Sequence, residues 1–241
     1  MLILTSWDDG HPSDLRLAEV LRCFGLKGTL FIPLANSEGL PVVNPVQIRR
    51  LAEDFEIGGH TLDHVYLNTL DRKEMLRQVG DCRKRLEDIT SAPVRGFCYP
   101  GGRLSEAAVA AVKDAGYGYA RTVEQFRFDV GSDLFRLPTT IQFYPHLYRA
   151  YCANYLRYGA YRTRWPAFKS LATARSLQER LRNVAMECMH TNGVFHLWGH
   201  SWELDALGLW NELESFLAFL TSLPHEAGSL DVCSRRATFA K

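Results

Sequence analysis

Two histidines four residues apart, His60 and His64, are the residues whose types and spacing point most directly to chemistry. In a helix or a tight turn, a spacing of four brings both imidazoles to one face, which is a metal-chelating geometry. Packed or surface pairs without a ligand share the same spacing. The zinc-protease motif is excluded, because it requires a glutamate directly after the first histidine and this chain has Thr61 there. A general base must come from elsewhere in the chain.

Two adjacent carboxylates, Asp8 and Asp9, are candidates for the missing groups. They follow a short apolar run at residues 2–7, and successive side chains at a strand end point in different directions. One aspartate could complete a two-histidine, one-carboxylate metal site while the other accepts a proton from water. Zn²⁺ suits these ligands best, and Co²⁺, Ni²⁺, Fe²⁺ or Mn²⁺ are tolerated. The alternative is a local Asp-Asp-Gly turn with a capping aspartate.

Composition narrows the class of protein. Lys plus Arg total 28 and Asp plus Glu 27, so a net charge of +1 offers no broad basic field for nucleic acid. Six cysteines without a CxxC pair indicate reduced, mostly buried thiols. No apolar run reaches the roughly 20 residues that span a bilayer, and the N-terminus lacks the basic region of a signal peptide. We expect a single domain, 1–241, in the cytoplasm, and the oligomeric state is not indicated.

Strands alternate with helices along the chain, which predicts parallel βαβ units. Strands are expected at residues 2–7, 28–34, 55–59, 94–99, 117–123, near 135–140 and at 194–199. Helices are expected at residues 15–24 after a Ser13 cap, 46–54, 71–90, 106–115 between a Ser105 cap and a Gly116 stop, 173–190 and 209–223. Residues 144–164, rich in tyrosine and arginine, have no clear assignment.

About seven such units in a domain of this size favour a closed or nearly closed barrel over an open doubly wound sheet, although the sequence leaves both open. In either fold, ligands bind at the carboxyl ends of the strands. The chemically suggestive residues all fall at predicted strand ends, namely Asp8, Asp9, His60, Tyr99 and His200. The sequence therefore predicts one site on one rim.

Four segments, SWDDG, HTLDH, RGFCYP and the WGH of HLWGHSWE, resemble in order and spacing the signature blocks of the polysaccharide deacetylase family, also called carbohydrate esterase family 4 or NodB-type domains. The resemblance runs from about residue 2 to 220. It implies an α/β fold, a distorted, incomplete (β/α)7 TIM-like barrel with mostly parallel strands, and a single catalytic domain over residues 1–241.

The resemblance also implies a role for individual residues. Asp8 would be the general base, held by Arg95, and His200 the general acid that protonates the leaving amine. The metal ligands would be Asp9, His60 and His64. The backbone N–H of Tyr99 would stabilise the oxyanion, with Trp198 near the acyl methyl. Read from the residues alone, Arg95 could be a surface cation, and Tyr99 and Gly101 could form a mere turn, whose glycine allows a substrate to approach the backbone.

Two departures from the family pattern stand out. Trp7 occupies the usual phenylalanine position of the first block. The fourth block, whose aspartate and tryptophan orient the acidic histidine, has no clear match, and Glu203 or Asp205 could supply the carboxylate instead.

These observations predict a metal-dependent hydrolase that removes an N-acyl group, acetyl or formyl, from an amino sugar. Without an export signal, a nucleotide-linked or lipid-linked sugar of surface-polysaccharide biosynthesis is the expected substrate, with residues 144–164 as a substrate-selecting insertion. One alternative is hydrolysis of a non-sugar amide or ureide on the same fold. Another is a carbohydrate-binding barrel without catalysis, which the joint presence of base, ligands and acid disfavours.

Overall fold

The computed structural model describes residues 1–233, and in this part of the chain eight strands form one sheet with parallel pairing throughout. The strand order is β5-β4-β3-β2-β1-β7-β6, and β8 pairs with β1. The strands are β1 (Leu2–Asp8), β2 (Thr29–Ile32), β3 (Glu56–Gly59), β4 (Gly96–Cys98), β5 (Tyr119–Arg121), β6 (Ile141–Gln142), β7 (Val194–His200) and β8 (Glu226–Gly228).

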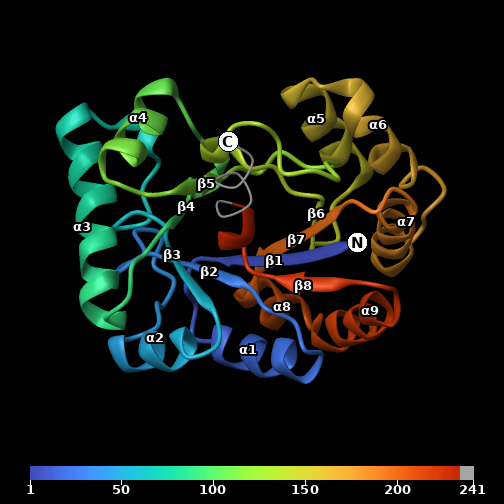
Figure 1. Ribbon diagram of the computed structural model, residues 1–241, viewed down its shortest axis with the longest axis horizontal. Coiled ribbons are helices and arrows are strands. Elements are labelled where there is room, and N and C mark those ends of the chain that lie inside the picture. The colour runs from blue at the N-terminus through green and yellow to red at the C-terminus, as the bar shows by residue number, and fades with distance from the viewer. Residues whose placement is uncertain (234–241) are drawn as a thin grey trace.

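Helices surround the curled sheet, as Figure 1 shows, with α3 and α4 on one side, α1 and α2 below, and α5, α6, α7 and α9 on the other side. Their bounds are α1 (Asp14–Cys23), α2 (Pro45–Ala52), α3 (Arg72–Thr90), α4 (Glu106–Asp114), α5 (Tyr148–Tyr158), α6 (Tyr161–Lys169), α7 (Leu177–His190), α8 (Ser201–Leu207) and α9 (Trp210–Ser222). Within residues 1–233, no helix is both long and apolar enough to cross a lipid bilayer.

The barrel does not close. β5 and β6 end the strand path, and the region between them carries a single parallel bridge, Arg121 to Leu137. β8 pairs with Leu2–Leu4 of β1, while β2 pairs with Ser6–Asp8, so the two strands share one edge of β1. The predicted distorted, incomplete barrel of parallel strands is thereby confirmed.

Local sequence explains most element boundaries. β1 is buried along nearly its whole length, as expected for a central parallel strand covered on both faces. Asn44 caps α2 in a capping box with Gln47, and the Ser105 side chain accepts a hydrogen bond from the Ala108 N–H at the start of α4. Ser13 occupies the cap position of α1, but its backbone is already helical and its side chain makes no cap bond.

The structure corrects one predicted strand and adds elements that were left unassigned or were not predicted. Residues 134–136 form a 3₁₀ turn rather than the sixth strand, because Pro138 has no N–H to donate to a ladder, and pairing with β7 begins only at Ile141. The unassigned stretch 144–164 contains α5 and the start of α6. The short elements α8 and β8 were not predicted, since neither has the length that makes a periodic pattern visible.

Candidate metal and catalytic site

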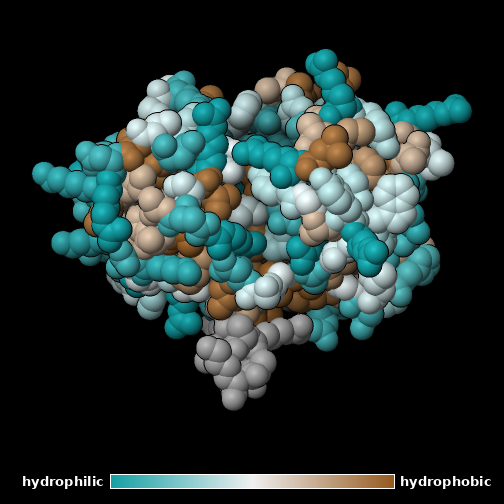
Figure 2. Space-filling view, turned by 90° about the horizontal axis from the view of Figure 1, so that it is seen from above, coloured by the Kyte–Doolittle hydropathy of each residue, from teal (hydrophilic) through white to brown (hydrophobic). Residues whose placement is uncertain are grey.

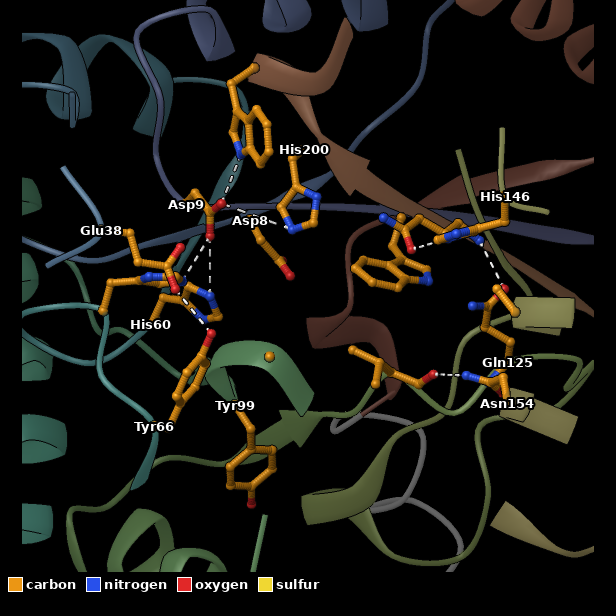
Figure 3. Close-up of a pocket in the computed structure, with 17 residues that line it drawn as sticks. Asp8, Asp9, Glu38, His60, Tyr66, Tyr99, Gln125, His146, Asn154 and His200 are labelled. Atoms are coloured by element: carbon orange, nitrogen blue, oxygen red, sulfur yellow. Dashed lines mark hydrogen bonds and ion pairs between the residues drawn. The ribbon is translucent and has the colours of Figure 1, made fainter. Parts of the chain in front are cut away.

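The carboxyl ends of β1, β3, β4 and β7 meet around one cavity of about 390 Å³. Figure 3 shows the side chains that converge on it. The lining residues are Asp8, Asp9, Glu38, His60, His64, Tyr66, Tyr99, Gly101, Val123, Gln125, Gln142, His146, Ala150, Asn154, Trp198, His200 and Trp202. Every predicted site residue except Arg95 lies in this wall.

Asp9, His60 and His64 form a buried cluster whose candidate ligand atoms all lie within 4.8 Å of one another. Asp9 Oδ1 is 3.5 Å from His60 Nε2 and 3.1 Å from His64 Nε2. The intervening segment is not helical. Thr61 and His64 adopt left-handed backbone conformations, with φ of 63° and 53°, and the two imidazole centroids lie 5.0 Å apart.

The surroundings of this trio fit a bound divalent transition metal. His60 Nδ1 lies 2.8 Å from the carbonyl oxygen of Cys98, which can only accept, so Nδ1 carries a proton and Nε2 is the ring nitrogen that faces Asp9 and could ligate a metal. Such an outer hydrogen bond is typical of metal-ligating histidines. Two imidazole nitrogens and one carboxylate oxygen are ligands that zinc and related ions accept.

Asp9 is held in place on its other side. Trp202 Nε1 donates a 2.8 Å hydrogen bond to Asp9 Oδ2, and the backbone of Asp9 has a φ of 77°, a strained value for a residue other than glycine. Burial acts to raise the pKa of Asp9, but the hydrogen bonds to His60 and His64 and the charge of His200 outweigh it and lower that pKa. Asp9 is therefore a carboxylate with one oxygen turned to the histidines.

Asp8 is paired with Arg121, and both oxygens of the carboxylate accept hydrogen bonds from Arg121 Nη2. Both side chains are almost fully buried. Burial acts to raise the pKa of Asp8, but the charges of Arg121, His60 and His200 lower it below its usual value. Asp8 is thus kept ionised at the edge of the cavity.

The predicted contact between Arg95 and Asp8 is wrong. Arg95 precedes β4 and so lies at the amino end of that strand, away from the carboxyl-end rim. Its side chain is 55% exposed, and its Nη1 lies 3.8 Å from Asp231 Oδ1. Arg121 is the last residue of β5 and pairs in register with Cys98 at the end of β4, which brings its guanidinium to the rim.

His200, the last residue of β7, faces Asp9 and is held by Glu203. Its Nδ1 lies 2.9 Å from Glu203 Oε2, and its Nε2 lies 3.9 Å from Asp9 Oδ2. Burial acts to lower the pKa of His200, but the Glu203 hydrogen bond and the charge of Asp9 raise it to about 9. Asp205, the other candidate, instead accepts a hydrogen bond from Trp210. Glu203 is the carboxylate that contacts this histidine.

The predicted substrate-contacting residues line the cavity in different ways. The Tyr99 hydroxyl donates to the Phe135 carbonyl, and in Figure 3 its ring points away from Asp9 and His60, so only its backbone can face a ligand. The Trp198 ring lies 5.7 Å from the His200 ring. Gly101 has a φ of 60°, and a Cβ there would lie 2.8 Å from the Tyr66 ring. Their functional roles stay predictions.

The wall opposite the histidines was not foreseen. Gln125 and His146 come from loops and Asn154 from α5, where no strand-end rule applies. Gln142 is the last residue of β6, a strand that the sequence placed too early in the chain. His146 Nε2 lies 2.8 Å from Gln142 Oε1, and Gln142 Nε2 lies 3.4 Å from Glu203 Oε2. The stretch 144–164 does contribute His146, Ala150 and Asn154 to the cavity, but its part in selecting a substrate stays a prediction.

Buried Arg164 fastens this wall to the barrel. It donates hydrogen bonds to the carbonyl of Gln125 at 2.7 Å and to Asn154 Oδ1 at 2.7 Å. It also donates to the carbonyls of Tyr155 and Gly159. A fully buried guanidinium satisfied mainly by neutral oxygens therefore fixes α5 and α6 to the loop after β5.

Two curated proteins match about half of this chain in sequence. The Bacillus subtilis (strain 168) protein YxkH is 27% identical over 124 residues, which cover 51% of this chain and 44% of YxkH. The peptidoglycan-N-acetylglucosamine deacetylase of Bacillus cereus is 28% identical over 120 residues, or 48% of this chain and 54% of that enzyme. The matched part thus spans about half the length of these curated relatives.

Solved structures extend the likeness of fold to nearly the whole chain. A structure from Mycobacterium smegmatis superposes with a TM-score of 0.68 at 15% identity, covering 98% of this chain and 89% of that one. A family 4 acetyl xylan esterase from Clostridium thermocellum, in complex with a cobalt ion, gives 0.59 at 14% identity over 96% and 89%. The family model for polysaccharide deacetylase matches residues 1–120, which contain Asp8, Asp9, His60 and His64. Through these residues, the chain belongs to the polysaccharide deacetylase family.

Proposed function

We propose that this chain is a metal-dependent hydrolase that removes an N-acyl group, acetyl or formyl, from an amino sugar. One observation carries the proposal: a carboxylate and an imidazole with opposite tendencies to hold a proton face the same cavity as the metal-ligand cluster. Arg121 keeps Asp8 ionised, whereas Glu203 favours the protonated form of His200. Such a separation of proton affinities is what a base and an acid of one reaction require.

Each residue then has a distinct task. Asp9, His60 and His64 would hold the metal, most simply Zn²⁺, which supplies a Lewis acid for the acyl carbonyl and for water. Asp8 accepts the proton of the attacking water, and Arg121 orients its carboxylate. His200 Nε2 donates a proton to the departing amine, with Glu203 fixing the ring through Nδ1. The Tyr99 N–H would stabilise the oxyanion, and Trp198 would contact the acyl group.

The lining of the cavity supports a sugar ring rather than a phosphate at the reacting end. Among the residues of the described chain that line it, none is Lys or Arg. Glu38, Gln125 and Asn154 offer carboxylate and amide groups that suit sugar hydroxyls. The curated relative that acts on N-acetylglucosamine of peptidoglycan, by its name, agrees with this class of substrate.

Acetate and formate release from a panel of N-acylated amino sugars tests the proposal, with small amides and ureides in the same panel. Protein loaded with zinc or cobalt should hydrolyse at least one sugar. Asp8→Asn should abolish turnover while elemental analysis still finds about one metal per chain, and Arg95→Met, as the matched control, should keep full activity. Turnover retained by Asp8→Asn would sink the assignment of the base. Activity confined to the non-sugar amides would replace the substrate class.

A further inference from the structure

A long stretch of this chain is free of acidic residues. Residues 134–178 contain no Asp or Glu and seven basic residues, Arg136, Arg149, Arg157, Arg162, Arg164, Lys169 and Arg175. The whole chain has a net charge of only +1, so this positive charge is local and is compensated elsewhere. The stretch includes both α5 and α6.

Three of these arginines project into solvent without a counter-charge. Arg149, Arg157 and Arg162 are exposed, and none of them makes an ion pair within residues 1–233. The other two basic residues of α6 are buried or paired with a carboxylate. Arg164 is buried, and Lys169 Nζ lies 3.8 Å from Glu187 Oε1.

Large apolar and aromatic side chains are exposed between these arginines. They are Leu147, Tyr148, Leu156, Tyr161 and Trp165, with exposed fractions of 63%, 42%, 66%, 49% and 52%. Elsewhere in residues 1–233, the exposed large hydrophobic side chains are Val46 and Leu207. In Figure 2, the half of the molecule that carries α5 and α6 shows pale and brown surface between projecting teal side chains.

A layer of packed rings holds this surface rigid. Tyr155 and Phe168 stack with centroids 4.2 Å apart, and Trp165 lies 6.2 Å from Phe168. The Tyr155 hydroxyl donates to the Tyr161 carbonyl, and the Tyr161 hydroxyl donates to the Leu156 carbonyl. These ring contacts and hydrogen bonds thus brace the two helices beneath their exposed residues.

We propose that the α5–α6 face, defined by Leu147, Tyr148, Arg149, Leu156, Arg157, Tyr161, Arg162 and Trp165, docks onto the surface of an anionic lipid bilayer. Trp and Tyr favour the bilayer interface, leucine side chains insert among the acyl chains, and guanidinium groups pair with lipid phosphates. The absence of carboxylates from the stretch removes the repulsion that an anionic surface would otherwise exert. An anionic bilayer supplies both the apolar interior and the dense negative charge that this face would match, whereas a protein partner would need an apolar patch and acidic groups together.

Docking would place the cavity beside the bilayer. Arg149 and Leu156 are seven residues apart and share one stripe of α5, whereas Ala150 and Asn154 of the same helix line the cavity. Arg164 ties α5 to the loop after β5, so the outer and inner sides of this helix move as one unit. The inference concerns binding alone and stands whether or not the proposed deacylation is correct.

Co-sedimentation of the full chain with vesicles tests the inference. We expect binding to phosphatidylcholine vesicles that contain 30% phosphatidylglycerol, weaker binding to pure phosphatidylcholine, and a decrease as salt is raised. Each arginine near such a surface contributes roughly fivefold in affinity, so the triple change Arg149→Gln, Arg157→Gln, Arg162→Gln should weaken binding about a hundredfold. Trp165→Ser should weaken vesicle binding as well. Brominated lipid should quench the fluorescence of Trp165, which is measured as the difference in tryptophan fluorescence between wild type and Trp165→Phe.

The matched control removes the same charge from another surface. Lys73, Lys84 and Arg85 are exposed on α3, and changing all three to glutamine should leave vesicle binding unchanged. No binding to the anionic vesicles at low salt would overturn the inference, as would equal losses in the two triple variants. Self-association of the chain that Trp165→Ser abolishes, with no affinity for vesicles, would assign the face to a second copy instead.

Discussion

Arg121, which pairs with Asp8, and Arg95, which lies near Asp231, offer a direct comparison between a buried and an exposed arginine–carboxylate pair. Replacing Arg121 with methionine keeps much of the side-chain volume but leaves Asp8 without its counter-charge in a site where both side chains are at most 4% exposed. Breaking one side of a buried pair costs about 3–5 kcal/mol. For a chain of this size, that corresponds to a fall in Tm of roughly 6–20 °C.

Arg95→Met is the matched control. Its side chain is 55% exposed and 3.8 Å from Asp231, and exposed pairs of this kind contribute about 0–1 kcal/mol. Thermal and urea unfolding of both variants should therefore separate them clearly. The double variant Asp8→Asn, Arg121→Met should recover part of the loss in Arg121→Met, because it leaves no unpaired charge, and the double-mutant cycle should give a coupling energy of at least ~1 kcal/mol.

The pH dependence of the same variants supplies a second readout. The pKa of Asp8 in the folded protein lies below the ordinary value of 3.8, so its ionised form stabilises the fold above about pH 4 and this contribution is lost as the pH falls. Arg121→Met should weaken that contribution, and the acidic limb of kcat/KM should move to higher pH. Equal effects of Arg95→Met and Arg121→Met on stability and on the acidic limb would refute the assignment of Arg121.

Three further predictions concern the metal, the acid and a buried carboxyl. Zinc at about 100 times its Kd should raise the free energy of unfolding by about 2.7 kcal/mol, and His60→Ala should lose this gain in a thermal-shift titration. Glu203→Gln should move the basic limb of the rate profile to lower pH, because Glu203 helps raise the pKa of His200 to about 9, whereas Asp205→Asn should not move it. Burial raises the pKa of Asp14 to about 8, so the contribution of Asp14 to the free energy of unfolding should fall between about pH 4 and pH 8, with a limiting slope of ~1.4 kcal/mol per pH unit. Asp14→Asn should remove this contribution. The same pH slope in urea titrations of wild type and Asp14→Asn would contradict the prediction.

The sequence predicted the central elements well because their patterns are long or sharply bounded. Residues 71–90 match α3 almost to the residue, since nineteen helical residues repeat the period several times. The rim could be predicted because parallel strands bring their carboxyl ends together, and Asp8, His60 and His200 all follow that rule. Residues with no place in this rule, such as Gln125 and Asn154, could not be foreseen.

The error over Arg95 has a different cause. A sequence block fixes which residues are neighbours along the chain, but the partner of a buried carboxylate is chosen by neighbours in space. Arg121 lies on β5, where it pairs in register with Cys98 of β4, and it is 113 residues from Asp8 in the chain. A lone arginine in a short apolar strand was the available indication, because an unpaired guanidinium is too costly to bury. Its partner could be named only once the strand order was known.

Asp8 and Asp9 differ in their surroundings more than in their positions. Alternation at the end of β1 turns Asp8 toward Arg121 on β5, while the left-handed backbone of Asp9 turns its carboxylate toward the histidines and Trp202. The first aspartate meets a fixed positive charge, which keeps it ionised, as the proposed general base must be before it accepts a proton. The second meets imidazole nitrogens, which a cation can share. The strand geometry thus gives two identical, adjacent side chains different surroundings, which suit the separate tasks proposed for them. Exchanging those surroundings would require a change in the backbone rather than in either residue.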